Sequence, residues 1–62
     1  MPTIFVHMLA GRTLDEKRAL VKGITNGVVE ALNVKPEVVQ IHLMEKPKEH
    51  LARGGVLRID EK

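Results

Sequence analysis

The chain has 62 residues, a formal net charge of +2 and no cysteine, so we expect one small domain over residues 1–62 without disulfides or thiolate-bound metal. A domain this short buries only about 60% of the surface that its unfolded chain exposes. Its three histidines lack the spacing of a metal site such as HExxH. We therefore expect no metal site, and we expect oligomerisation to supply the missing buried area.

Residues 3–9 (TIFVHML) predict the first strand, because they are rich in apolar and β-branched residues and end at the turn-forming AGR. Both faces of this strand are apolar, as in strands that are covered on both sides. One face carries Ile4, Val6 and Met8, and the other carries Phe5 and Leu9 with His7 between them.

A helix is expected next, beginning at Leu14. Thr13 and Glu16 have the spacing of a capping box, in which the threonine hydroxyl and the glutamate carboxylate satisfy unpaired backbone N–H groups. Asn33 suits the position just past the end of the helix. The apolar stripe of this helix consists of Leu20, Ile24, Val28 and Leu32, flanked by Val21 and Ala31.

Gly23 and Gly27 lie inside this helix, where each costs up to about 1 kcal/mol relative to alanine. Small residues four positions apart allow another backbone to approach closely. We interpret them as a tight contact with the sheet or with a second helix; the alternative is tolerated sequence drift.

Residues 38–44 (VVQIHLM) predict a second strand with one fully apolar face. A strand, a helix and a strand in succession form a β-α-β unit with parallel strands and a right-handed crossover. The tail has turn residues at Lys46-Pro47 and Gly54-Gly55, which predict a short hairpin with a last strand over residues 56–59. The expected fold class is α/β: one β-α-β unit plus a C-terminal hairpin.

The single helix can cover only one face of this two-stranded sheet. The other face is left without a partner inside the chain, so other subunits must cover it. The expected residues of this uncovered face are Phe5, His7, Leu9, Val38, Gln40 and His42.

Composition argues against nucleic acid and membrane as partners. Phe5 is the one aromatic residue and the cations are dispersed, whereas proteins that bind single-stranded nucleic acid need stacking aromatic side chains. No run approaches the roughly 18 apolar residues of a membrane-spanning helix, and the first twelve residues do not have the pattern of a signal peptide. We expect a cytoplasmic protein.

Pro2 and Arg12 are the candidate chemical groups. If Met1 is removed, Pro2 becomes a secondary amine, which can act as a general base when its pKa is low enough for it to be neutral. Arg12 lies just before the helix and could bind a carboxylate bidentately. The alternatives are a proline that merely suits the start of a strand and a solvated arginine.

The whole chain resembles the 4-oxalocrotonate tautomerase family. The resemblance rests on the initial MP, the strand ending in LAGR, the capping-box helix, the segment VVQIHLMEKPKEH and the GG hairpin. It implies a homo-oligomer of dimers, usually a hexamer, and cofactor-free proton transfer on 2-hydroxydienoates or related enol acids. It further implies that Pro2 is the general base, that Arg12 binds a substrate carboxylate, and that such enzymes serve aromatic hydrocarbon catabolism.

Two positions depart from the family pattern. Gln40 stands where the family has an arginine that polarises the 2-oxo group, and Leu51 stands where it has an aromatic residue. Arg53 or His42 could replace the missing charge, although a solvent-facing Arg53 and an interface His42 are the alternatives. The expected substrate-binding residues are Arg12, Gln40, Arg53, Leu9 and Leu51.

Two other functions stay open. One is hydration or dehalogenation of an unsaturated acid, which requires a water-activating carboxylate near Pro2. The other is a structural subunit of a mixed oligomer with little activity of its own, which the residues at Gln40 and Leu51 favour.

Overall fold

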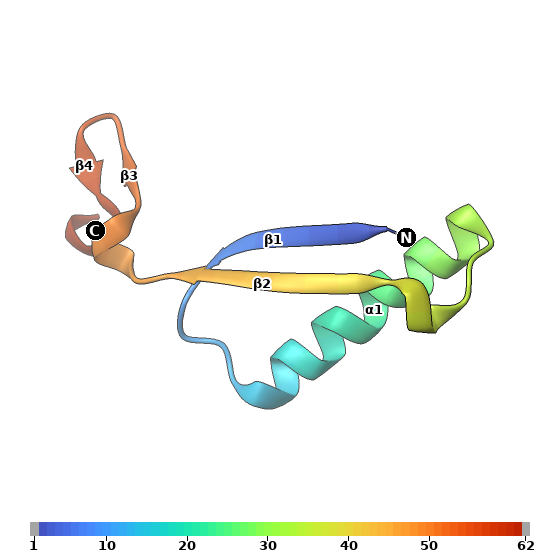
Figure 1. Cartoon of the computed structure of the whole chain (residues 1–62). Helices are drawn as coiled ribbons and strands as arrows, with labels where there is room; N and C mark the ends of the chain where they lie inside the picture. Colours follow the sequence, from blue (N-terminus) through green and yellow to red (C-terminus); the bar gives the residue numbers. More distant parts are fainter. Residues whose placement is uncertain (1, 62) are drawn as a thin grey trace.

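The computed structural model of the chain describes residues 2–61. Its main unit consists of β1 (Thr3–Leu9), α1 (Leu14–Leu32) and β2 (Gln40–Lys46), and its tail forms a hairpin of β3 (Ala52–Arg53) and β4 (Val56–Leu57). β1 and β2 pair in parallel, from Thr3 opposite Gln40 to Leu9 opposite Lys46. Figure 1 shows α1 along one side of these strands and the hairpin projecting beyond one end of the sheet. The expected β-α-β unit with a C-terminal hairpin is confirmed.

The local signals at both ends of α1 act as expected. The Thr13 hydroxyl accepts a hydrogen bond from the Glu16 backbone N–H, and the Glu16 carboxylate accepts one from the Thr13 N–H. At the other end, Asn33 takes the left-handed conformation with φ 54° and its N–H bonds to the Val29 carbonyl. No helix among residues 2–61 is both long enough and apolar enough to cross a membrane.

Alternation along β1 and β2 separates a covered face from an open face. Ile4, Val6 and Met8 of β1 are half-buried beneath α1, as are Ile41 and Leu43 of β2. The central part of the predicted helix stripe is also half-buried, but its end is not: Leu32 is 59% exposed and Ala31 is exposed.

The second strand and the last strand differ from their expected bounds. Residues 36–38 form a 3-10 turn that begins at Pro36, so β2 starts at Gln40 rather than Val38, and it continues to Lys46. β4 ends at Leu57 because the chain turns into another 3-10 segment, Arg58–Asp60, in place of the longer strand that the sequence predicts.

The prediction that Gly23 and Gly27 contact the sheet is wrong. A Cβ atom added at either position would meet no other atom within 4 Å, and both residues are exposed in the chain. They lie beside the half-buried residues Ile24 and Val28 rather than among them, since adjacent helical positions are rotated by about 100°. Contact of these glycines with a second helix stays a prediction.

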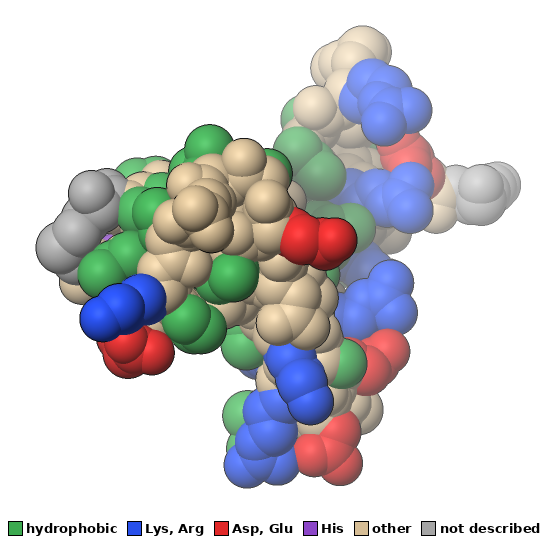
Figure 2. Space-filling model, turned by 90° about the vertical axis from the view of Figure 1, so that its right-hand side faces the viewer, with side chains coloured by type: hydrophobic (Ala, Val, Ile, Leu, Met, Phe, Trp, Pro, Cys, Tyr) green, Lys and Arg blue, Asp and Glu red, His purple; other side chains and the backbone are tan. Residues whose placement is uncertain are grey.

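None of the residues from 2 to 61 is fully buried within one chain. The molecule extends over 42 × 24 × 14 Å, and hydrophobic side chains reach the surface between interspersed acidic and basic groups (Figure 2). On the open face of the sheet, Phe5 is 58% exposed and its ring stacks on His42 with a centroid distance of 4.9 Å. The helix covers one side of the sheet only, as expected. Two of the residues expected on the open face, Leu9 and Val38, are instead half-buried, and Val38 lies in the 3-10 turn before β2.

Candidate functional site

The candidate site residues fall into two groups at opposite ends of the sheet. Pro2 and Gln40 meet at the start of the strands, where the Gln40 N–H donates a hydrogen bond of 3.1 Å to the Pro2 carbonyl. Leu9 lies at the far end of β1, opposite Lys46. Seven strand residues span about 20 Å, so a small ligand at Pro2 of one chain does not reach Leu9 of the same chain.

Pro2 is held at this end by backbone geometry. Its carbonyl is fixed by the Gln40 N–H, its side chain is half-buried, and the ring itself restricts φ. The predicted removal of Met1 concerns a residue outside the described range.

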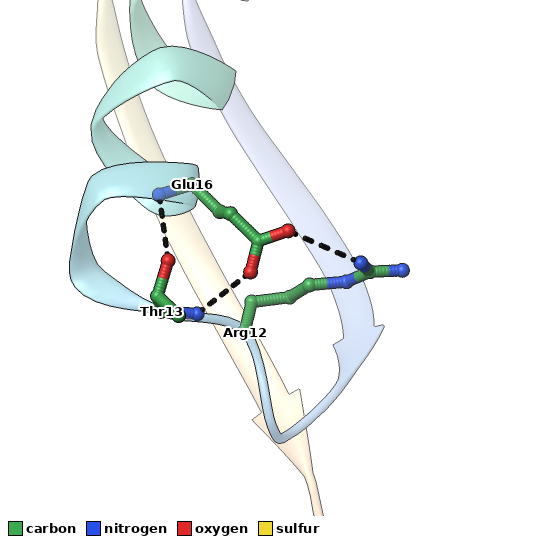
Figure 3. A network of polar contacts seen from close by, with 3 residues as sticks. All are labelled: Arg12, Thr13 and Glu16. Carbon is green, nitrogen blue, oxygen red and sulfur yellow. Dashed lines mark hydrogen bonds and ion pairs between the residues drawn. The ribbon is translucent and has the colours of Figure 1, made fainter.

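Arg12 follows the far end of β1, in the loop that leads into α1. Gly11 lies in this loop with φ 119°, a conformation that favours glycine. The Arg12 guanidinium lies 3.3 Å from a Glu16 carboxylate oxygen, while the other oxygen of that carboxylate accepts the Thr13 N–H at 2.9 Å (Figure 3). The same side chain thus caps α1 and holds Arg12.

The surroundings of Glu16 favour its ionised form. The hydrogen bond from the Thr13 backbone N–H is the main cause that lowers the pKa of Glu16, and the charge of Arg12 adds to it. Partial desolvation acts in the opposite direction. A negative Glu16 therefore keeps Arg12 at the helix start, over a hollow of about 200 Å³ whose lining is Met8, Arg12, Glu16, Lys17 and Leu20.

A second hollow of about 250 Å³ lies where the tail meets the end of β1. It brings together three residues that sequence reasoning selected, Leu9, Leu51 and Arg53. Leu9 and Leu51 also share a third hollow with Lys46. The two leucines thus form an apolar wall beside cationic side chains, as expected for residues that bind an organic acid.

Sequence reasoning missed two residues that line the second hollow, Arg58 and Glu61. Their side chains form an ion pair, and the Arg58 N–H donates a hydrogen bond of 2.7 Å to the Leu51 carbonyl. The i,i+3 spacing of Arg58 and Glu61 was the available signal. The sequence predicts a strand over residues 56–59, and in a strand this spacing does not bring the two side chains together. The structure instead has a 3-10 segment at Arg58.

The three histidines do not gather in any of the three hollows. His42 stacks on Phe5 in the middle of the open sheet face, and His50 is exposed in the tail. His7 lines the third hollow. Within residues 2–61, no three histidine or acidic side chains are arranged to hold a metal ion.

Comparison with known proteins decides the family of this fold. The family model described as tautomerase enzyme matches residues 2–59, from Pro2 through the hairpin. The chain belongs to the tautomerase family. A probable tautomerase from Halalkalibacterium halodurans is 38% identical over 55 residues, which are 89% of this tautomerase and 90% of that relative.

Two further comparisons agree with this assignment. The 2-hydroxymuconate tautomerase of Bacillus subtilis is 38% identical over 55 residues, covering 89% of each chain. A solved structure of a 4-oxalocrotonate tautomerase isozyme from Methylibium petroleiphilum superposes with a TM-score of 0.89 at 38% identity. That match covers 94% of this tautomerase and 91% of the isozyme. The resemblance read from the sequence is therefore confirmed.

Proposed function

We propose that this protein is a cofactor-independent tautomerase that moves a proton on the enol form of a 2-oxo acid, with Pro2 as the general base. The match of the tautomerase family over residues 2–59, which begins at Pro2, is the observation that carries the proposal. Its relative in Bacillus subtilis is a 2-hydroxymuconate tautomerase, which favours a 2-hydroxydienoate as the substrate class.

The proposed reaction needs one group that both accepts and returns a proton. Once Met1 is removed, the Pro2 amine takes the proton from the enol oxygen and becomes a protonated amine. The electron pair left on oxygen forms the carbonyl, and the conjugated double bond shifts. The protonated Pro2 then delivers the proton to a carbon of the substrate, so the product is the isomeric keto acid and Pro2 is neutral again.

The proposed binding groups divide between the two ends of the sheet. Gln40 lies beside Pro2 and is proposed to donate a hydrogen bond to the substrate carbonyl without supplying charge. Arg12 is proposed to bind a carboxylate, and Arg53 is proposed to supply the cation that Gln40 lacks. Leu9 and Leu51 line the hollow beside Arg53 and are proposed to pack against the carbon chain of the substrate.

The separation of these groups favours a homo-oligomer in which the site is shared. Pro2 and Leu9 mark opposite ends of strands that are about 20 Å long, so one subunit must place its Pro2 against the far end of another. The open face of the sheet, with Phe5 exposed, supplies apolar area for such contacts. We propose a hexamer built as a trimer of dimers.

The test has two steps. Intact mass of the purified protein establishes whether Pro2 is the first residue. Ketonisation of a 2-hydroxydienoate is then followed by ultraviolet absorbance for the wild type and for Pro2→Ala, which is expected to lose at least about a hundredfold in rate because general-base catalysis is removed. Equal rates for the two proteins would contradict the proposal.

A structural subunit of a mixed oligomer is the second candidate. It is favoured by the uncharged Gln40 beside Pro2 and by Leu51 in place of an aromatic residue. This candidate requires that the purified chain, with its processed Pro2, has no tautomerase rate by itself and gains one when a second tautomerase chain is added.

A further inference from the structure

We infer that Arg58, together with Arg53, forms a carboxylate-binding site in the hollow between the end of β1 and the C-terminal hairpin, and that Glu61 occupies the place of the ligand's carboxylate when no ligand is bound. The ligand class is a small organic acid with a carboxylate and an apolar carbon chain. Its identification as the substrate rests on the proposed function, whereas the binding site itself does not.

The hairpin fixes the positions of both arginines. Arg53 pairs with Val56 across a two-residue turn, in which Gly54 and Gly55 both have positive φ, as the tightest hairpin turns require. The chain then returns, and the Arg58 backbone N–H bonds to the Leu51 carbonyl at 2.7 Å. Arg53 and Arg58 therefore line the same hollow although four residues separate them in the sequence.

The lining of this hollow suits the two halves of an organic acid. Leu9 and Leu51 supply apolar surface, and Arg53 and Arg58 supply planar guanidinium groups that bind carboxylates bidentately. The volume of about 250 Å³ is slightly below the range of roughly 300–1,000 Å³ for small-molecule sites, which restricts the ligand to a small acid. The lining carries two cations against the single carboxylate of Glu61, so the hollow favours an anionic ligand over a neutral one.

Glu61 shows that a carboxylate already fits at Arg58. The Glu61 carboxylate contacts the Arg58 guanidinium and lines the same hollow, and their side chains are 30% and 50% exposed. A ligand carboxylate can take the place of Glu61 without separating Arg58 from a negative partner, because one charge-assisted pair replaces another. Glu61 thus competes with the ligand and lowers its affinity.

Arg53 and Arg58 supply the positive charge that Gln40 lacks. The cations that line the hollow between the end of β1 and the hairpin come from the tail, at Arg53 and Arg58, whereas the residue beside Pro2 is a neutral amide. We assign the second cationic contact of the ligand to the tail of the chain rather than to β2.

Calorimetric titration with adipate tests the inference. Adipate is a saturated six-carbon dicarboxylate that cannot tautomerise, so its binding does not depend on proton transfer by Pro2. We expect Arg58→Gln to weaken binding about five- to tenfold, because a charge-assisted contact is lost at a half-exposed position. We expect Glu61→Gln to tighten binding by about threefold, because the competing carboxylate is removed.

Arg18 provides a matched control. It is also an exposed arginine that pairs with an acidic residue three positions away, Asp15, at 2.8 Å, but it lies on α1 and lines none of the three hollows described above. Arg18→Gln and Asp15→Asn are expected to change the adipate affinity by less than about twofold. A loss in Arg58→Gln no larger than that in Arg18→Gln overturns the inference, as does wild-type protein that does not bind adipate.

One further variant, Arg58→Lys, keeps the test decisive if Arg58→Gln does not assemble. Arg58→Lys keeps the charge but not the planar fork, so a partial loss of affinity is expected, and unchanged affinity in both Arg58→Lys and Glu61→Gln overturns the inference. Pro2→Ala is expected to bind adipate as the wild type does while losing catalysis. Failure of the proposed function would therefore appear in the rate assay, and failure of this inference would appear in the titration.

Discussion

We expect each active site to be shared between two subunits. Pro2 and Arg12 belong to opposite ends of the β1–β2 pair, because Pro2 bonds to Gln40 at the start of β2 and Arg12 follows Leu9, which pairs with Lys46 at the end of β2. The seven residues of each strand separate these ends by about 20 Å. One small substrate can contact both groups only if they come from different chains.

Mixed oligomers of two inactive variants give a measurable rate that depends on this geometry. Pro2→Ala and Arg12→Gln chains are each expected to be nearly inactive alone. The two variants are unfolded, mixed in equal amounts and refolded together. Each site then receives Pro2 from one chain and Arg12 from another, and each of these two residues is the wild-type residue in half of the sites. About one quarter of the sites should then carry both groups, and about one quarter of the wild-type rate should return.

The assay is the ketonisation rate of a 2-hydroxydienoate at fixed total protein, with native mass spectrometry to show that mixed oligomers have formed. Simple mixing without unfolding serves as the control, because intact oligomers that exchange slowly keep their inactive sites. If mixed oligomers form and the rate stays at the level of the two parents, then Pro2 and Arg12 of one chain serve the same site, and the argument from the strand length is refuted.

Three further outcomes are expected. Glu16 has a lowered pKa, so its contribution to stability is complete above its ordinary pKa of about 4.5 and is lost as the pH falls below it; Glu16→Gln, which keeps a capping oxygen, should show a smaller acid-side loss of stability in urea titrations between pH 7 and pH 3. Thr13→Ala removes the acceptor of the Glu16 N–H at 3.1 Å and should cost about 1 kcal/mol per chain in urea unfolding at fixed protein concentration, whereas Thr13→Ser should cost much less; equal losses would show that the hydroxyl is not the stabilising group. Gln40→Arg should raise kcat on a muconate-type enol, because a charge is added beside Pro2, and an unchanged kcat would show that Gln40 does not limit catalysis.

The parts of the fold that sequence predicts well are those set by local chemistry. The capping box fixes the start of α1 at Leu14, and a run of apolar and β-branched residues that ends at a turn fixes β1 as Thr3–Leu9. Prediction was poorer where two local preferences compete. Val38 and Val39 favour a strand, but Pro36 begins a 3-10 turn that delays β2 to Gln40.

The candidate site was predictable in part for a related reason. The structure brings Leu9, Leu51 and Arg53 together in one hollow, but their roles in binding stay predictions, as do the roles of Pro2 and Gln40. The sequence does not predict that Arg58 and Glu61 line this hollow, because their positions depend on how the tail turns back after β4. No periodic pattern encodes that turn, since it depends on the backbone bond from Arg58 to Leu51.

In the homo-oligomer proposed above, the absence of a fully buried side chain among residues 2–61 of one chain links the folding of the chain to its abundance. A chain that completes its core only by association obeys mass action, so each tenfold dilution lowers the apparent free energy of unfolding by about 1 kcal/mol per chain. Expression level then acts as a thermodynamic variable: a cell that makes little of the protein holds a less stable protein, and one that makes more stabilises every copy.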